Sequence, residues 1–275
     1  MRNGHYVIDA HCHIYPEKIA RRAADNISDF YDGRPHVAGY TATLLAVMEQ
    51  TGTDYAVINS AAMSPGQVEP VNSFLLETAA AHPDKLAAVG TVHPECTGAQ
   101  MEHAFRFLLD NGFHGVKIHS DMLRIPMDDP VMNRVYAGCR ESGLPVLLHT
   151  GDYRFDFSNP AQLVNVLEKF PDLQVIGTHM GGWSVYAEAM ERLPGYPNIV
   201  VDCSSSFCDL TAEETMAIFR AFGTERILYG TDFPIIVPGF AMDYFLRLPL
   251  TETEREDILW RNAVKAYNLS PPWGK

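Results

Sequence analysis

Long hydrophobic runs are absent from this sequence of 275 residues, and none approaches the ~20 residues that a helix needs to cross a bilayer. A signal peptide is not expected either, because the first predicted strand begins at about Tyr6 and leaves no room for a basic head and an apolar core. We therefore expect a soluble, cytoplasmic protein.

Positive charge is also scarce. Lysine and arginine together number 21 against 34 aspartates and glutamates, so the formal net charge is −13. Such a chain repels phosphate backbones and anionic lipid surfaces, which argues against nucleic acids and membranes as partners. With these partners disfavoured, a small-molecule substrate is the expected partner. Its charge is not restricted by the net charge of the chain, because net charge does not set the sign of the potential inside a pocket.

The five cysteines form no Cys-x-x-Cys pair, and their number is odd. A disulfide framework and a cysteine-only zinc site are therefore not expected, and a reducing compartment is the natural environment. The sequence also lacks a Gly-x-Gly-x-x-Gly turn after a strand. This absence counts against the main rival fold, an open doubly wound sheet that binds a dinucleotide.

Short apolar runs, several of them rich in valine and isoleucine, recur along the whole chain. Few of them alternate with polar residues, which is typical of parallel strands that are covered on both faces. The eight predicted strands are Tyr6–Ala10, Tyr55–Asn59, Leu86–Val92, Gly115–Ile118, Pro145–Leu148, Leu173–Gly177, Ile199–Asp202 and Ile227–Gly230.

Helical patterns lie between these runs. Capping boxes at Thr211 and Thr251 predict two helix starts. The other predicted helices are Tyr40–Gln50, Val71–His82, Gln100–Asp110, Pro130–Ser142, Pro160–Phe170 and Val185–Leu193. Strand followed by helix eight times over predicts a (β/α)8 TIM barrel of parallel strands, formed by residues 1–275 as a single domain, with the active site at the carboxyl-terminal face.

The segment Val7–His13 begins as an apolar strand and ends in His-x-His. Side chains two residues apart on a strand point to the same face, so His11 and His13 should project together, as half of a divalent metal site. Carboxyl ends of barrel strands converge on one mouth. Six of the 11 histidines fall at predicted strand ends, the other four being His93, His119, His149 and His179.

A catalytic divalent ion, most simply Zn²⁺, prefers imidazole nitrogen and carboxylate oxygen and keeps one position open for water. The strand ends supply such a set: His11, His13, His149 and Asp232. Asp232 could also accept a proton from that water and pass it to the leaving group. His179 stands where it could orient the water or stabilise charge that develops on the substrate.

Four residues near the predicted mouth are candidate substrate contacts: Lys117, His119, Arg154 and Trp183. Cationic groups there would suit a carboxylate-bearing substrate. Other interpretations stay open. His93 and His119 are either pocket residues or hydrogen-bonded core residues, Arg124 and Arg154 are either substrate contacts or solvated loop residues, and Gly181-Gly182 is either a plain turn or a close approach to a ligand.

Five motifs together resemble the amidohydrolase superfamily, in particular the amidohydrolase 2 branch that includes aminocarboxymuconate-semialdehyde decarboxylase. The motifs are His11-Cys12-His13-Ile14-Tyr15-Pro16, Gly115-Val116-Lys117-Ile118-His119, the strand end at His149, Thr178-His179-Met180-Gly181-Gly182 and Gly230-Thr231-Asp232-Phe233-Pro234. The resemblance implies a (β/α)8 barrel with one zinc-like ion held by the four ligands named above. It implies that His179 activates water or substrate, and it suggests a homodimer.

Lys117 stands about where other branches of the superfamily have a carboxylated lysine that bridges two metals. In the decarboxylase branch, which this chain resembles, the lysine does not form such a bridge. We expect one metal and an uncarboxylated Lys117. TatD-like nucleases also begin with His-x-His but use a glutamate as ligand at this strand, where this chain has Lys117.

Three functions compete on these residues. The first is a hydrolase, in which metal-activated water attacks a small amide, ester or lactone. The second is a non-oxidative decarboxylase of a small unsaturated or aromatic acid, and the third is a barrel that binds a metal or metabolite without turnover. The sequence places the hydrolase first, and release of CO₂ without hydrolysis would favour the second.

Overall fold

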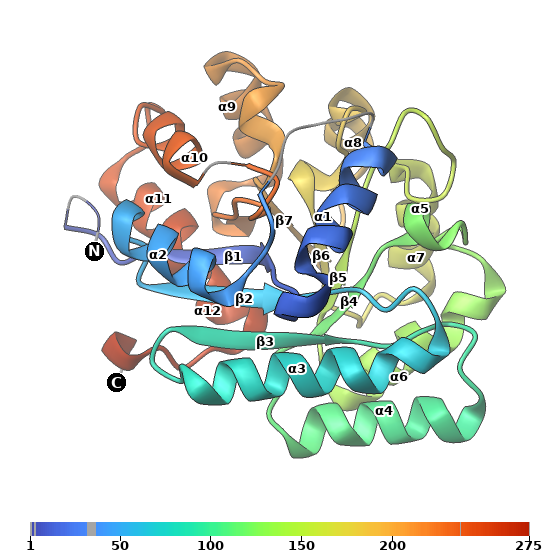
Figure 1. The fold of residues 1–275 in the computed structure, drawn as a ribbon. Coiled ribbons are helices and arrows are strands. Elements are labelled where there is room, and N and C mark those ends of the chain that lie inside the picture. Colours follow the sequence, from blue (N-terminus) through green and yellow to red (C-terminus); the bar gives the residue numbers. More distant parts are fainter. Residues whose placement is uncertain (1, 3, 32–36, 237, 275) are drawn as a thin grey trace.

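A computed structural model describes the whole chain except residues 1, 3, 32–36, 237 and 275 (Figure 1). Its described residues contain eight strands that pair in parallel in the order β1 to β8. The strands are β1 Ile8–His13, β2 Tyr55–Asn59, β3 Leu86–Thr91, β4 Val116–Ile118, β5 Val146–Leu148, β6 Val175–Gly177, β7 Ile199–Asp202 and β8 Ile227–Leu228. The predicted (β/α)8 barrel is confirmed.

The barrel closes where β1 meets the chain that follows β8. The Ala10 amide donates to the Tyr229 carbonyl at 2.9 Å, and the Asp232 amide donates to the His11 carbonyl at 3.0 Å. The buried Asp9 carboxylate accepts from the Thr231 hydroxyl at 2.6 Å. These bonds fasten the ends of the first and last strands together, although they are more than 200 residues apart in the sequence.

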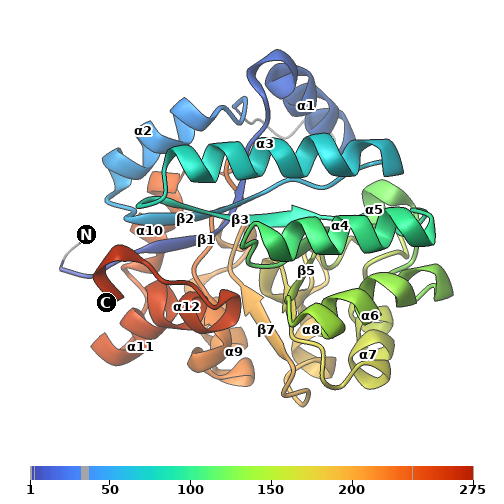
Figure 2. The same cartoon turned by 90° about the horizontal axis from the view of Figure 1, so that it is seen from below.

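Helices cover the outside of the barrel (Figure 2). The strand residues are almost all buried, because those that point outward pack against these helices and those that point inward fill the barrel. Val57, Leu147 and Ile176 belong to the inner cluster, whereas Ile58, Leu148 and their neighbours pack outward against the helices. The strand positions follow the prediction, except that β1 runs on to His13 because it continues to pair with β2. Cys12, which stands between the two histidines of β1, points outward.

The helices are α1 Glu17–Phe30, α2 Thr41–Thr51, α3 Val68–Ala81, α4 Gly98–Asp110, α5 Ser120–Leu123, α6 Asn133–Ser142, α7 Pro160–Lys169, α8 Tyr186–Arg192, α9 Ala212–Phe222, α10 Pro238–Phe245, α11 Glu252–Glu256 and α12 Asn262–Tyr267. The capping boxes at Thr211 and Thr251 are confirmed. Over the described part of the chain, each helix is too short or too polar to cross a membrane.

Helix α1 was not predicted. It follows Pro16 without a side-chain cap, and only Ala20 and Ala24 of its residues are buried. Figure 1 shows α1 lying beside the carboxyl ends of the strands. The ring of Tyr31, directly after α1, lies 6.3 Å from that of His149, so the end of this helix covers the mouth of the barrel.

Candidate active site

Three of the predicted ligands meet at the end of β1 and just beyond β8. The Nε2 atoms of His11 and His13 lie 3.0 Å apart, because residues two apart on a strand share a face. The Asp232 Oδ1 atom lies 3.1 Å from His13 Nε2 and 3.6 Å from His11 Nε2. All three side chains are buried or nearly so.

These separations suit ligands of one cation. Two ligands at 2.0–2.1 Å from a tetrahedral Zn²⁺ ion lie roughly 3.3 Å apart. Burial lowers the pKa of His11 to about 4, and it also lowers the pKa of His13. Both imidazoles are therefore neutral and can offer a lone pair to a metal ion. The residues present therefore fit a divalent ion.

Asp232 is held as a carboxylate. Burial alone would raise its pKa, but a hydrogen bond with His13 and the proximity of His11 and His179 hold the pKa well below its usual range. Its second oxygen accepts a hydrogen bond from Ser205 at 2.6 Å. Asp232 has a φ of 66°, in the left-handed region that costs a non-glycine residue about 1–3 kcal/mol. The closure of the barrel imposes this conformation and aims the carboxylate at the two histidines.

Asp202, the last residue of β7, orients His11 from behind. Its Oδ2 atom lies 3.0 Å from His11 Nδ1, and its Oδ1 atom accepts from the amides of His179 and Ser204, both at 3.0 Å. A carboxylate at Nδ1 places the proton there and leaves Nε2 free to face Asp232. Despite burial, the nearby imidazole of His11 lowers the pKa of Asp202 to about 2.

Lys117, in β4, is buried, and its Nζ atom lies 3.3 Å from His11 Nε2. Burial lowers its pKa to about 8, although Asp232 and Asp202 act in the opposite direction. Its amine is therefore placed at the edge of the three-ligand group, where it could contact a bound anion.

The fourth predicted ligand, His149, lines the same pocket as Asp232. It lies outside the group formed by His11, His13 and Asp232. Its Nδ1 atom is 3.1 Å from His179 Nε2, and its Nε2 atom is 3.7 Å from Asp121 Oδ2 without a hydrogen bond. His179 is held by the carbonyl and hydroxyl of Ser204, each 2.9 Å from Nδ1. His149 and His179 therefore form a pair of imidazoles across the pocket from Asp232.

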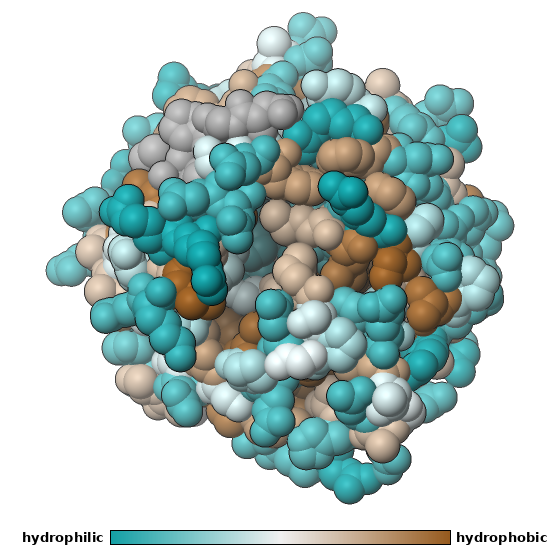
Figure 3. Space-filling model, turned by 45° about the vertical axis from the view of Figure 1, so that its right-hand side comes forward, coloured by the Kyte–Doolittle hydropathy of each residue, from teal (hydrophilic) through white to brown (hydrophobic). Residues whose placement is uncertain are grey.

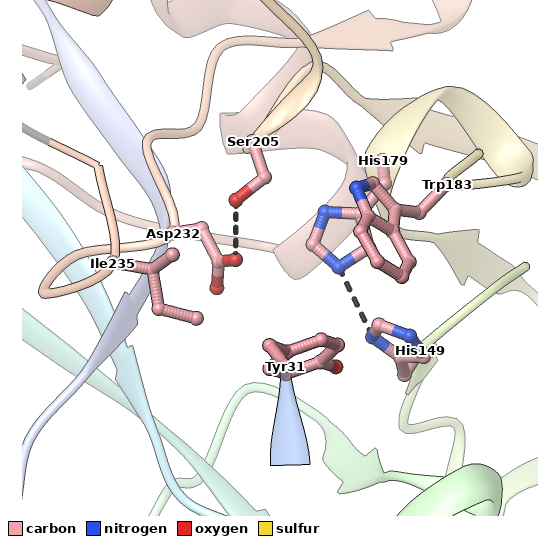
Figure 4. Close-up of a pocket in the computed structure, with 7 residues that line it drawn as sticks. All are labelled: Tyr31, His149, His179, Trp183, Ser205, Asp232 and Ile235. Carbon is pink, nitrogen blue, oxygen red and sulfur yellow. Dashed lines mark hydrogen bonds between the residues drawn. The ribbon is translucent and has the colours of Figure 1, made fainter. Parts of the chain in front are cut away.

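Figure 4 shows this pocket, whose volume is about 250 Å³ when the open space at its mouth is included. The ring of Trp183 and the ring of Tyr31 lie 5.3 Å apart, nearly perpendicular, and form an aromatic wall. A planar ring could lie against this wall with a polar substituent turned toward the histidines and Asp232. The residues that line the pocket are Tyr31, His149, His179, Trp183, Ser205, Asp232 and Ile235.

The other predicted substrate contacts lie in different surroundings. His119 lines the larger cavity beside this pocket, and its Nε2 atom is 3.0 Å from the Tyr31 hydroxyl. Arg124 lines that cavity too and is exposed. His93 is buried and accepts a hydrogen bond from the nearby Glu95 amide. The glycines at 181 and 182 pack closely against Leu193 and Ala189 rather than facing the pocket.

Arg154 is engaged with protein groups. Its guanidinium forms a two-pronged ion pair with the buried Asp152, through contacts of 2.9 and 2.7 Å, and donates to the Phe30 carbonyl at 2.6 Å. It also lies 5.2 Å from the Tyr31 ring centre and 5.6 Å from that of Trp183. Arg154 thereby fastens the end of α1 over the barrel mouth.

We expect Arg154→Met to lower the free energy of unfolding by about 3 kcal/mol, because Asp152 would be left as a buried charge without its partner. Urea unfolding followed by circular dichroism measures this loss. Arg154→Lys keeps the positive charge but not the planar guanidinium that makes two contacts with Asp152, so it should lower the free energy of unfolding by less. Equal stability of Arg154→Met and the wild type would contradict the anchoring role.

Sequence reasoning missed several residues of this site. Asp202 could have been found, because it is a carboxylate at the end of the predicted strand Ile199–Asp202. Asp232 was found in this way, just after the predicted strand Ile227–Gly230. Tyr31, Ser205 and Asp121 carry no comparable signal, since they stand in segments without a clear pattern.

Comparison with known proteins places the chain among related sequences. A family model described as "Amidohydrolase" matches residues 8–269. A 2-amino-3-carboxymuconate-6-semialdehyde decarboxylase of Dictyostelium discoideum is 21% identical over 241 residues, which cover 73% of this chain and 66% of that protein, slightly less than two thirds.

Solved structures show the same fold. A 2,6-dihydroxybenzoate decarboxylase complexed with 2,6-dihydroxybenzoate superposes with a TM-score of 0.77 at 18% identity, covering 96% of this chain and 100% of that chain. A dihydroxybenzoic acid decarboxylase of Polaromonas sp. JS666, with bound manganese and the inhibitor 2-nitroresorcinol, superposes with a TM-score of 0.75 at 17% identity, covering 98% and 99%.

Proposed function

The chain belongs to the amidohydrolase family, and from this premise we propose that it is a metal-dependent decarboxylase of a small aromatic or unsaturated carboxylic acid. The observation that carries the proposal is the convergence of His11, His13 and Asp232 beside a pocket with an aromatic wall. The named relatives are decarboxylases, and they favour this reaction over the hydrolase that the residue types alone placed first.

We propose that one divalent ion is held by His11, His13 and Asp232, with His149 as the fourth ligand. Zn²⁺ is our first choice because imidazoles dominate this set, and the manganese in one relative makes Mn²⁺ the alternative. When bound, such an ion supplies positive charge that attracts the carboxylate and a neighbouring oxygen of the substrate. We keep Lys117 as an uncarboxylated amine that contacts the same anionic group.

The remaining chemistry belongs to side chains of this protein. Asp232, whose carboxylate lines the pocket, is placed to accept a proton from an acidic group of the substrate and return it to the carbon that carries the carboxylate. The bond between that carbon and the carboxylate then breaks, its electron pair returns to the ring, and CO₂ leaves. The net change replaces a carbon–carbon bond with a carbon–hydrogen bond.

His179 and the aromatic side chains position the substrate in this proposal. His179 lines the pocket, and its imidazole, which is hydrogen-bonded to His149 through Nε2, can interact with charge that develops on the substrate during protonation. Trp183 and Tyr31 hold the ring, and His119 reaches it through the Tyr31 hydroxyl. Arg154 acts on the substrate only through the helix end that it anchors.

The test is product analysis with the metal-loaded protein. We expect 2,6-dihydroxybenzoate or a related acid to yield CO₂ and the decarboxylated phenol in equal amounts. Removal of the metal with a chelator should abolish this activity, and Zn²⁺ or Mn²⁺ should restore it. Hydrolysis of esters, amides or lactones without CO₂ would favour the hydrolase, and tight binding of metabolites without turnover would favour a binding barrel.

We further propose that residues 1–275 act as one catalytic domain, in the cytoplasm, as a homodimer. Light scattering coupled to size-exclusion chromatography measures the oligomeric state directly.

A further inference from the structure

The active-site cavity continues outward as a channel between α1 and α3. The cavity that reaches His13, His149 and Asp232 encloses about 1090 Å³ together with the open space at its mouth. A second hollow of about 1440 Å³ extends away from it toward α3. The two hollows adjoin, because they share five lining residues: Tyr15, Ala23, Asn26, Ala61 and Met63.

One face of α1 lines this channel along its whole length. Ile19, Ala23, Ile27 and Phe30 follow one another at intervals of three or four residues and therefore share a face. All four are only partly buried, whereas Ala20 and Ala24 are buried against the barrel. From Ile19 to Phe30 the helix rises roughly 16 Å, which is the length of the apolar wall.

The opposite wall is formed by the loop after β2 and by α3. Met63 stands 39% exposed in that loop, and Val71 and Phe74 of α3 lie further out, both partly buried. Lys18, Arg22 and Glu77 also line the outer hollow but not the inner cavity, so charge gathers at the far end. In the space-filling view a hollow opens on this side of the molecule, with hydrophobic surface on its border (Figure 3).

We propose that this channel binds an apolar tail of the substrate, so that the enzyme prefers aromatic acids that carry an alkyl chain on the ring. The inference rests on the proposed function, because the acid group would occupy the pocket beside Asp232. That pocket is walled by Tyr31 and Trp183 and adjoins the inner cavity, with which it shares Tyr31, His149, His179, Asp232 and Ile235. A ring held there can direct a substituent into the channel, where it would cover the half-exposed face of α1.

The test compares 2,4-dihydroxybenzoates that carry a methyl or a pentyl group at the sixth carbon. We measure kcat/KM for CO₂ release and, separately, the dissociation constant by calorimetry. Each buried methylene should strengthen binding roughly threefold to fourfold. The pentyl compound has four more methylenes than the methyl compound, so it should bind roughly 80- to 250-fold more tightly if all four are buried and about tenfold more tightly if two are, with a matching gain in kcat/KM.

Two variants narrow the channel from opposite walls where the two hollows adjoin, within reach of a pentyl group on the ring: Ala61→Trp in the loop after β2 and Ala23→Trp on α1. In both, the preference for the pentyl over the methyl compound should fall to near one. The control is Asp25→Trp, which adds the same side chain to an exposed position of α1 that does not line the channel and should keep the full preference. Circular dichroism confirms that each variant folds.

Binding and turnover separate the two proposals. If the pentyl compound binds more tightly and the narrowed variants remove this gain, the channel is supported even when no CO₂ is released, and only the decarboxylase proposal fails. If CO₂ is released but chain length does not change the dissociation constant, or if both narrowed variants keep the preference, the channel proposal is wrong.

Discussion

Asp232→Asn is expected to reduce kcat for decarboxylation by ~10² to 10⁴, the range typical of a lost general acid–base group. The amide has nearly the same shape as the carboxylate, but it can neither accept a proton from the substrate nor return it. The substitution also removes the negative charge of Asp232, which lies close to His11, His13 and His179. Steady-state kinetics with the metal-loaded variant measure the effect.

The matched control is Ser205→Ala, which removes the hydrogen bond that Asp232 accepts at 2.6 Å but leaves the carboxylate in place. We expect it to retain most of the activity. If Asp232→Asn kept wild-type kcat with a full complement of metal, Asp232 would not carry the proton. If both variants lost activity equally, the hydroxyl rather than the carboxylate would be the important group.

His11→Ala is expected to lose the bound ion. His11 is fully buried and oriented by Asp202, so its Nε2 atom is fixed toward His13 and Asp232 before any metal arrives. Loss of a group that merely orients a ligand costs about 10- to 100-fold in metal affinity, and loss of the ligand itself should cost more. Metal content after dialysis, measured by plasma mass spectrometry, should fall from one equivalent to near zero.

His179→Asn serves as the comparison, because we assign His179 to the substrate rather than to the metal. It should keep the ion while kcat falls by ~10² or more. Retention of metal by His11→Ala would overturn the ligand assignment. Loss of metal from His179→Asn would move His179 into the ligand set in place of the more distant His149.

The barrel could be predicted from the sequence because its signal is local. The strand Tyr55–Asn59 is apolar up to its last residue, since it is buried on both faces, and this pattern is readable without knowledge of its neighbours. The capping box at Thr211 is equally local, with donor and acceptor three residues apart. Helix α1 was missed although Ile19, Ala23, Ile27 and Phe30 recur at helical spacing, and the absence of a cap left its start unmarked.

By itself, then, the sequence determined the strand–helix alternation, the shared face of His11 and His13, and the placement of histidines at strand ends. Only the tertiary structure decided that Asp202 reaches His11 across 191 residues, that Arg154 is occupied by Asp152, and that His149 turns toward His179. The physical reason is that backbone periodicity sets which way a strand residue points, whereas its partner depends on how the closed barrel brings distant strand ends together.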